Sequence, residues 1–226
     1  MQCVILVAGR GVRMGELTQD TPKPMLKIRG IPKLEYTLRA LPAEVTEVIF
    51  VIGYLGGIIR EHFGKHWDGR RITYVEQVRL NGTGGAIHLA RNLVRGRFLV
   101  INGDDLYLRE DLERLMRYDL AVLACAVGDS DPFGVLETDM DGKLVSIIER
   151  PHDGTVKLVN TGAYMLNEKF FDYPLVSISQ TEYGLPQTLT SMRSEHDIAV
   201  EVTKTWFPIG TPEALSEAER IIEKFV

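Results

Sequence analysis

The feature that most restricts the fold is a regular alternation of apolar runs and amphipathic segments through the first half of the chain. Apolar runs typical of buried strands occupy residues 3–7, 48–52, 72–75, 98–101 and 120–127. Between them, residues 32–41, 54–63, 83–93 and 110–117 carry apolar side chains at helical spacing. Strands that alternate with helices in this way predict an α/β fold, with a Rossmann-like, mostly parallel sheet and helices on both faces.

The pattern changes after about residue 128, where short strands replace the alternation. Residues 135–138 and 144–149 flank an Asp-Gly turn at Asp141 and Gly142, and residues 157–165 form a further apolar run. Near the end, residues 212–225 predict an amphipathic helix with Thr211 as its N-cap. We therefore expect one domain over 1–226, with an α/β half (1–128) and a mixed β half (129–226), and no second catalytic domain.

The charge and the cysteines limit the class of protein. The formal net charge of −5 argues against a general nucleic-acid binder, so an anionic ligand requires a local cluster of cations. Apolar runs stay well short of the roughly 20 residues of a membrane span, and the N-terminus lacks a signal peptide. Cys3 and Cys125 both lie in strand-like runs, which favours buried, reduced thiols. These observations predict a cytoplasmic protein without membrane partners.

A glycine-rich turn follows the first predicted strand. Gly9 and Gly11 allow a phosphate to approach the backbone, but the third glycine of a dinucleotide fingerprint is replaced by Met14, and the Walker ending is absent. A plain structural turn remains an alternative at this point. Two cations accompany the turn: Arg13, and Lys23, which lies between two prolines that restrict its backbone. Fixed cations beside an anion-binding turn are typical of phosphoryl-type transfer.

Two further patterns fit a nucleotide site. Gln77 ends a predicted strand, and the glycine-rich segment 81–86 follows it; a glutamine amide both donates and accepts hydrogen bonds, as the edge of a base requires. Asp104 follows a buried strand, where α/β sheets bind ligands and where a carboxylate suits Mg²⁺. The plainer interpretations are a helix N-terminus for the first pattern and a helix cap for the second.

Taken together, the ordered motifs 6–14, 17–18 and 22–26 resemble the signature of the sugar-1-phosphate nucleotidyltransferases, the NDP-sugar pyrophosphorylases. The resemblance implies that the triphosphate is cradled by the glycine-rich turn and neutralised by cations, and that the base is read by the glutamine and its loop. It implies catalytic roles for Arg13, Lys23 and Asp104, with Asp104 as the Mg²⁺ ligand. The nucleotide-binding residues implied are Leu6, Ala8, Gly9, Gly11, Arg13, Gln77, Gly82, Thr83 and Gly103.

The second half resembles the family's acceptor side. The implied sugar-phosphate-binding residues are Gly134, Glu149, Arg150, Asn160 and Thr161. Three positions depart from the family pattern: Arg150 stands in place of the usual lysine, Gln187 replaces an acid, and Pro208 replaces the aspartate of a Trp-x-Asp-Ile-Gly-Thr-Pro element. That aspartate is the second protein ligand to magnesium in many relatives. Pro208 therefore predicts either a metal held by Asp104 with phosphates and water, another ligand, or reduced activity.

The function implied is transfer of a nucleotidyl group from a nucleoside triphosphate, with UTP or dTTP favoured, to a sugar 1-phosphate. Two alternatives stay open: a cytidylyltransferase acting on an alcohol phosphate such as phosphocholine, and a non-catalytic sugar-nucleotide sensor. The expected cofactor is Mg²⁺, and the expected partners are the two substrates, without nucleic acid. The resemblance is compatible with a homo-oligomer.

Overall fold

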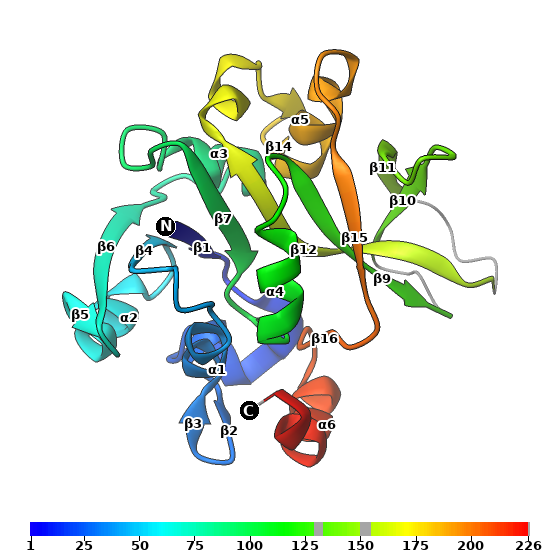
Figure 1. The fold of residues 1–226 in the computed structure, drawn as a ribbon. Coiled ribbons are helices and arrows are strands. Elements are labelled where there is room, and N and C mark those ends of the chain that lie inside the picture. The colour runs from blue at the N-terminus through cyan, green and yellow to red at the C-terminus, as the bar shows by residue number, and fades with distance from the viewer. Residues whose placement is uncertain (129–132, 150–154, 226) are drawn as a thin grey trace.

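Strand β1 (Gln2–Val7) lies at the centre of the main sheet in the computed structural model, which describes residues 1–128, 133–149 and 155–225. It pairs in parallel with β4 (Glu47–Ile52) on one side and with β7 (Arg97–Asn102) on the other. Beyond β4 lies β6 (Arg70–Glu76), also parallel (Figure 1). The carboxyl ends of β1, β4 and β7 therefore meet at one edge of the sheet, where α/β folds place ligands.

Alternation along β1 divides the core between the two faces of the sheet. Cys3, Ile5 and Val7 belong to one cluster, together with residues of α1 (Lys33–Arg39), α2 (Gly56–Phe63) and α4 (Arg109–Leu115). Val4 belongs to the other cluster, with residues of α3 (Gly82–His88) and α5 (Leu185–Ser191). Both faces of the sheet are covered, which agrees with the near-continuous apolar character of its strands.

The second half of the chain extends the same sheet with antiparallel strands. The long strand β12 (Lys157–Asn167) pairs with β7 through its second part and with β9 (Ala121–Val127) along much of its length. Its register shifts between Asn160 and Tyr164, where Gly162 has a φ of 78°. The other members of this sheet are β5 (His66–Trp67), β10 (Gly134–Thr138), β11 (Leu144–Glu149) and β15 (Ala199–Thr203).

A third apolar cluster is separate from these two and is formed by segments at the lower end of Figure 1. Helix α6 (Pro212–Ile221) packs there with Ile222 against Ile28 and Tyr36. The short strand pairs of the fold are β2 (Lys27–Ile28) with β3 (Ile31–Pro32), β8 (Asp105–Leu106) with β16 (Phe207–Pro208), and β13 (Val176–Ser177) with β14 (Tyr183–Gly184). Pairing of β8 with β16 brings the chain's last strand beside the end of β7.

The structure confirms the predicted fold class. All five predicted strands of the first half are present, and Thr211 caps α6 by accepting a hydrogen bond from the N–H of Ala214 at 3.3 Å. The helix predicted over 83–93 ends earlier, at His88, and continues as turns. Cys3 and Cys125 are buried and unpaired, as expected.

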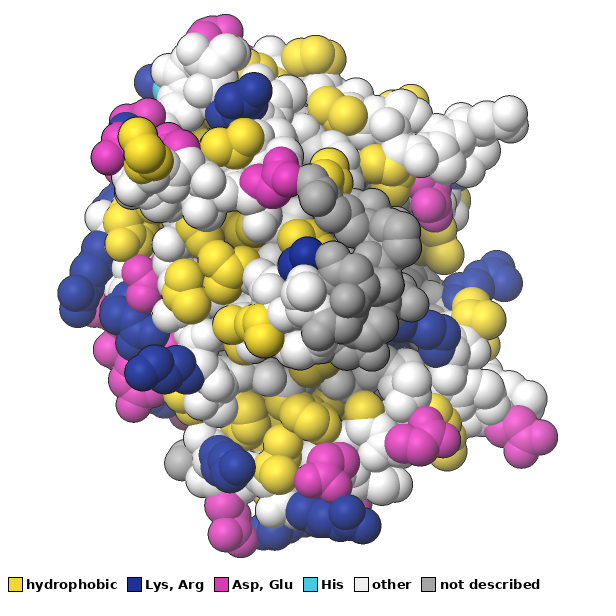
Figure 2. Space-filling view, turned by 90° about the vertical axis from the view of Figure 1, so that its right-hand side faces the viewer, with side chains coloured by type: hydrophobic (Ala, Val, Ile, Leu, Met, Phe, Trp, Pro, Cys, Tyr) yellow, Lys and Arg dark blue, Asp and Glu magenta, His cyan; other side chains and the backbone are white. Residues whose placement is uncertain are grey.

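On the face shown in Figure 2, acidic and basic side chains are interspersed, in keeping with the modest net charge of −5. Among the helices of the described ranges, none combines the length and the apolar character that a bilayer crossing requires.

Candidate active site

The glycine-rich turn leaves the carboxyl end of β1 and is shaped by contacts around Gly11. This residue has a φ of 67°, and a Cβ atom built on it would lie 2.8 Å from Cβ of Lys23. Its carbonyl oxygen accepts hydrogen bonds from the N–H of Met14 at 2.8 Å and from the hydroxyl of Thr18 at 3.2 Å. Glycine is required here because both the left-handed backbone and the close approach of Lys23 exclude a side chain.

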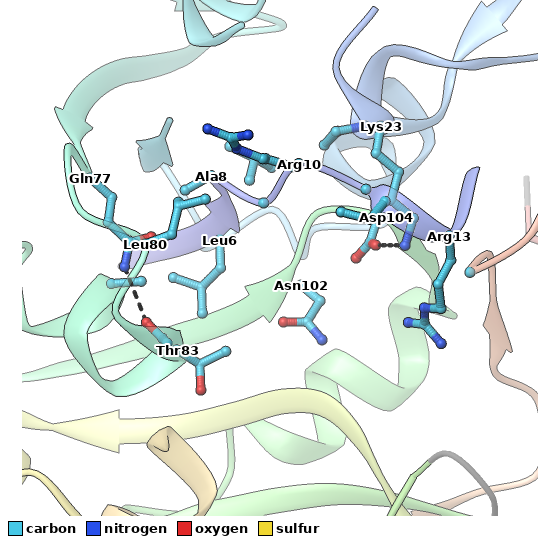
Figure 3. Close-up of a pocket in the computed structure, with 18 of the residues that line it drawn as sticks. Leu6, Ala8, Arg10, Arg13, Lys23, Gln77, Leu80, Thr83, Asn102 and Asp104 are labelled. Atoms are coloured by element: carbon cyan, nitrogen blue, oxygen red, sulfur yellow. Dashed lines mark hydrogen bonds and ion pairs between the residues drawn. The ribbon is translucent and has the colours of Figure 1, made fainter. Parts of the chain in front are cut away.

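Asp104 follows β7, and its carboxylate forms an ion pair with the ammonium of Lys23 (Figure 3). The side chains are only 12% (Lys23) and 25% (Asp104) exposed. Burial by itself raises the pKa of Asp104, but the cations of Lys23, Lys33 and Arg13 outweigh that effect and hold the pKa below its usual value. Asp104 is therefore ionised at neutral pH. The structure thus joins two of the three predicted catalytic residues directly, and Arg13 lies nearby in the same wall.

Behind this pair lies a buried group of polar residues. Lys33, in the first turn of α1, is 1% exposed, and its ammonium donates weak hydrogen bonds to the carbonyl oxygens of Asp104 at 3.4 Å and Ile209 at 3.5 Å. Burial lowers the pKa of Lys33 to about 8, so the side chain stays mostly protonated at neutral pH. Asp105 accepts a hydrogen bond from the N–H of Ile209 at 3.4 Å, and burial together with the charge of Asp104 raises the pKa of Asp105 to about 7.

In the loop predicted to bind the base, hydrogen bonds fix the side chain of Gln77. The amide nitrogen of Gln77 donates to the side-chain oxygen of Asn81 at 2.9 Å and to the carbonyl oxygen of Gly82 at 3.1 Å. Because a backbone carbonyl can only accept, the NH₂ group of Gln77 must face the loop, and its oxygen is left for another donor. Gln77 lines the larger pocket with Leu6, Leu80 and Thr83, as Figure 3 shows.

The second half of the chain packs directly on this loop. A Cβ atom on Gly82 would lie 2.3 Å from the carbonyl oxygen of Tyr183, and Gly82 has a φ of 84°. Two hydrogen bonds join the same segments: the N–H of Tyr183 donates to the carbonyl of Asn81 at 2.9 Å, and the N–H of Leu185 donates to the hydroxyl oxygen of Thr83 at 3.0 Å. The loop is therefore held in place by contacts with the second half of the chain.

Two adjoining pockets meet at the ion pair. The larger has a volume of about 520 Å³ and the smaller about 290 Å³. Their shared wall consists of Arg13, Lys23, Asn102, Asp104 and Gly210. The larger pocket also contains nearly all the predicted nucleotide-binding residues, namely Leu6, Ala8, Gly9, Gly11, Gln77, Gly82 and Thr83. A ligand in each pocket would approach the other at the Lys23–Asp104 pair.

The smaller pocket contains some of the predicted acceptor residues. Asn160 and Thr161 line it, although the amide of Asn160 donates to the hydroxyl of Tyr164 at 2.6 Å and the hydroxyl of Thr161 donates to the carbonyl of Leu123 at 2.9 Å. Gly134 belongs to β10 and is outside both linings. Glu149 ends β11, and its side chain, like the whole of Arg150, falls outside the described residues.

Gly103 is the one predicted nucleotide residue that the larger lining omits. A Cβ atom on it would lie 2.2 Å from Cγ1 of Val7, so the packing of β7 against β1 requires glycine here. Its contact with a nucleotide stays a prediction.

Several lining residues were not predicted as site residues, among them Asn102, Phe133 and Trp206. Asn102 ends β7 in the wall common to both pockets; the signal in the sequence is a polar residue that closes an apolar strand before Gly103. Phe133 and Trp206 line the smaller pocket with their rings edge to face, 5.1 Å between centroids. Phe133 and Trp206 are far apart in the sequence, and the local sequence around neither residue predicts that the two rings are in contact.

Pro208 lines the smaller pocket beside Asp105, its partner in the β8–β16 pair. Within the described ranges, His, Cys, Asp and Glu side chains form no group of three or more that could bind a metal ion.

Comparison with known proteins places these features in context. Residues 2–224 match the sequence model of a family described as nucleotidyl transferase. The chain is 33% identical to a bifunctional protein GlmU of Methanococcus aeolicus, over 99% of this chain and 55% of the relative. It is 28% identical to the UTP–glucose-1-phosphate uridylyltransferase AglF of Haloferax volcanii, over 99% of this chain and 97% of that protein.

Among solved structures, the chain resembles HddC from Yersinia pseudotuberculosis complexed with GMP-PN. The TM-score is 0.74 and the identity 28%, over 100% of this chain and 99% of that one. The chain spans little more than half the length of the GlmU relatives that it matches.

Proposed function

This chain belongs to the nucleotidyl transferase family, that of the sugar-1-phosphate nucleotidyltransferases, and we propose that it transfers a nucleotidyl group from a nucleoside triphosphate to a sugar 1-phosphate. The observation that carries the proposal is the pair of pockets that share Arg13, Lys23 and Asp104 in one wall. Such a wall suits a reaction between two anionic substrates, because each pocket delivers its phosphate to the same cations.

In the proposed reaction, an oxygen of the sugar 1-phosphate attacks the α-phosphorus of the triphosphate. A new phosphorus–oxygen bond forms, the bond to the bridging oxygen of the β-phosphate breaks, and pyrophosphate leaves with the bonding electrons. The attacking phosphate is already ionised at neutral pH, so no general base is needed. Arg13 and Lys23 stabilise the charge that develops on the phosphate oxygens, and the Gly9–Gly11 turn holds the outer phosphates.

The residues present fit a magnesium ion bound through a single carboxylate. Asp104 is ionised and borders both pockets, and Mg²⁺ is commonly held by one or two carboxylates together with substrate phosphates and water. We propose Asp104 as the protein ligand. When bound, the ion would neutralise charge on the phosphate oxygens. Pro208 has no side-chain donor, so the second protein ligand of many relatives has no counterpart at that position.

We further propose UTP or dTTP as the nucleotide. The oxygen of Gln77 can accept a hydrogen bond from N3–H of either pyrimidine, because its NH₂ group donates to the loop.

We also propose a cytoplasmic location for the protein. The two buried, unpaired cysteines support this location.

A substrate panel tests the proposal. UTP, dTTP, GTP, CTP and ATP are each mixed with a set of sugar 1-phosphates and with phosphocholine in the presence of Mg²⁺, and pyrophosphate release is measured. Release that requires UTP or dTTP and a sugar 1-phosphate is expected. Release only with CTP and phosphocholine would identify the cytidylyl alternative. Nucleotide binding without turnover across the whole panel would show a sensor and refute the proposed reaction.

A further inference from the structure

Lys33 is a cation that the proposed reaction does not use, and it lies directly behind the site. Its side chain is 1% exposed, although an ammonium is costly to bury without a compensating partner. The residue opens α1, whose other buried side chains include Leu34 and Leu38 of the core. The helix therefore fixes the backbone of Lys33, and the surrounding atoms enclose its side chain, whereas the side chain of a surface lysine could move into solvent.

Lys33 contacts the backbone of Asp104, which belongs to the shared wall, and of Ile209, which precedes Gly210 of that wall. Its ammonium donates to the carbonyl oxygens of Asp104 and Ile209, which are neutral acceptors, so neither contact is an ion pair. The charged groups that act on it are the carboxylates of Asp104 and Asp105, which favour the ammonium, and the ammonium of Lys23, which disfavours it. The uncharged Thr37, one turn along α1, donates to the carbonyl of Asp105 at 3.4 Å.

These charges bear on how a divalent cation reaches Asp104. The carboxylate already has an ion pair with Lys23, which lines both pockets and can turn toward a phosphate. Lys33 is buried and cannot withdraw, so a cation that approaches Asp104 meets its repulsion whether or not Lys23 has moved. The phosphates of a nucleotide supply the negative charge that offsets this repulsion.

We propose that Lys33 is a fixed positive charge that keeps the affinity of the nucleotide-free site for a divalent cation low, so that the metal binds together with the triphosphate. Lys33 is a positioning residue in this sense, since it acts through Asp104. The inference rests on the proposed function, because it concerns the order in which the ligands of that reaction bind.

The test measures metal binding without turnover. Mn²⁺ is titrated into the full chain at neutral pH without nucleotide, and the bound fraction is measured by electron paramagnetic resonance. We expect weak binding by the wild type and up to about tenfold tighter binding by Lys33→Met and Lys33→Gln, because the repulsive charge is gone. Lys33→Arg keeps the charge and should bind as weakly as the wild type. Thr37→Val alters an uncharged neighbour and should also leave the affinity unchanged.

Two results would overturn the proposal. One is Mn²⁺ affinity within about twofold of the wild type in both neutral Lys33 variants, with circular dichroism showing that they are folded. The other is a gain in affinity that survives in the Lys33→Met, Asp104→Asn double variant, since the ion would then bind elsewhere. If Lys33→Met fails to fold, the Mn²⁺ affinity of Lys33→Gln alone tests the proposal. Failure of the proposed function appears separately, as absence of pyrophosphate release from the wild type in the substrate panel.

Discussion

Lys23 and Asp104 lie 81 positions apart in the sequence and form an ion pair in the wall common to the two pockets. One residue comes from the segment after the glycine-rich turn, and the other from the end of β7. Each is the other's counter-ion in this structure, so substrate phosphates and a metal ion must share or replace that contact when they bind.

Replacing the charged residues of the shared wall should remove most of the activity. Arg13→Ala, Lys23→Ala and Asp104→Ala are each expected to lower the turnover number by about a hundredfold, as loss of other charge-stabilising groups does. The measurement is steady-state pyrophosphate release. Lys27→Ala, which removes an exposed lysine in β2, is the matched control and should turn over normally. Near-normal turnover in any of the three variants would remove that residue from the proposed mechanism.

Gly11→Ala should destabilise the fold as well as the site. The left-handed backbone at φ 67° and the overlap with Cβ of Lys23 at 2.8 Å should together cost about 2 kcal/mol in the free energy of unfolding. Denaturant titration measures the change. Gly9→Ala is the comparison for stability alone, because a Cβ atom there meets nothing within 4 Å. Equal stability of the two variants would show that the contact with Lys23 does not constrain the turn.

Gln77→Glu should weaken nucleotide binding more than it slows the chemical step. The carboxylate would face the carbonyl oxygen of Gly82 and the side-chain oxygen of Asn81, which now accept from the amide nitrogen. We expect the KM for the nucleoside triphosphate to rise about tenfold or more, because two hydrogen bonds become repulsive contacts. The KM for the sugar 1-phosphate provides the internal control. A change confined to kcat would contradict a role of Gln77 in base binding.

The stability of the metal-free protein should depend on pH through Asp105. Its pKa is raised from 3.8 to about 7 by burial and by the charge of Asp104, so the folded state binds a proton that the unfolded state has lost. This contribution to stability is complete below the unfolded pKa and is lost as the pH rises through 7. The free energy of unfolding, measured in a chelating buffer, should therefore fall between about pH 4 and pH 7. Asp105→Asn should flatten this slope; an unchanged slope would assign it to another group.

The sequence allowed prediction of features that depend on local order. The alternation of apolar runs predicted the parallel core, and the motifs around Gly9, Lys23, Gln77 and Asp104 predicted residues that the fold gathers around the larger pocket. Gly9, Gln77 and Asp104 follow strand ends, and the ends of parallel strands meet at one edge whatever the connections between them.

Features that depend on long-range packing could not be predicted. The hydrogen bond from Leu185 to Thr83 spans 102 positions, and that from Lys33 to Ile209 spans 176. Lys33 follows Pro32 at the start of a predicted helix, where a lysine is ordinarily exposed. Lys33 is covered in part by the segment around Ile209, which follows β16 and lies far away in the sequence. The local sequence around Lys33 carries no information about that contact. For the same reason the sequence did not show that Gly103 packs against Val7, a contact that by itself requires glycine.

The docking of Tyr183 on Gly82 has a consequence for attempts to change which base is used. The hairpin of β13 and β14 and the loop after β6 form a single interlocked unit, because no side chain fits at Gly82 while Tyr183 is in place. A chimera that takes only the loop from another enzyme would pack that loop against this chain's own segment around Tyr183, which does not match it. To exchange base preference between members of this family, residues 77–85 and residues 182–185 should therefore have to be replaced together, although they are separate in the sequence.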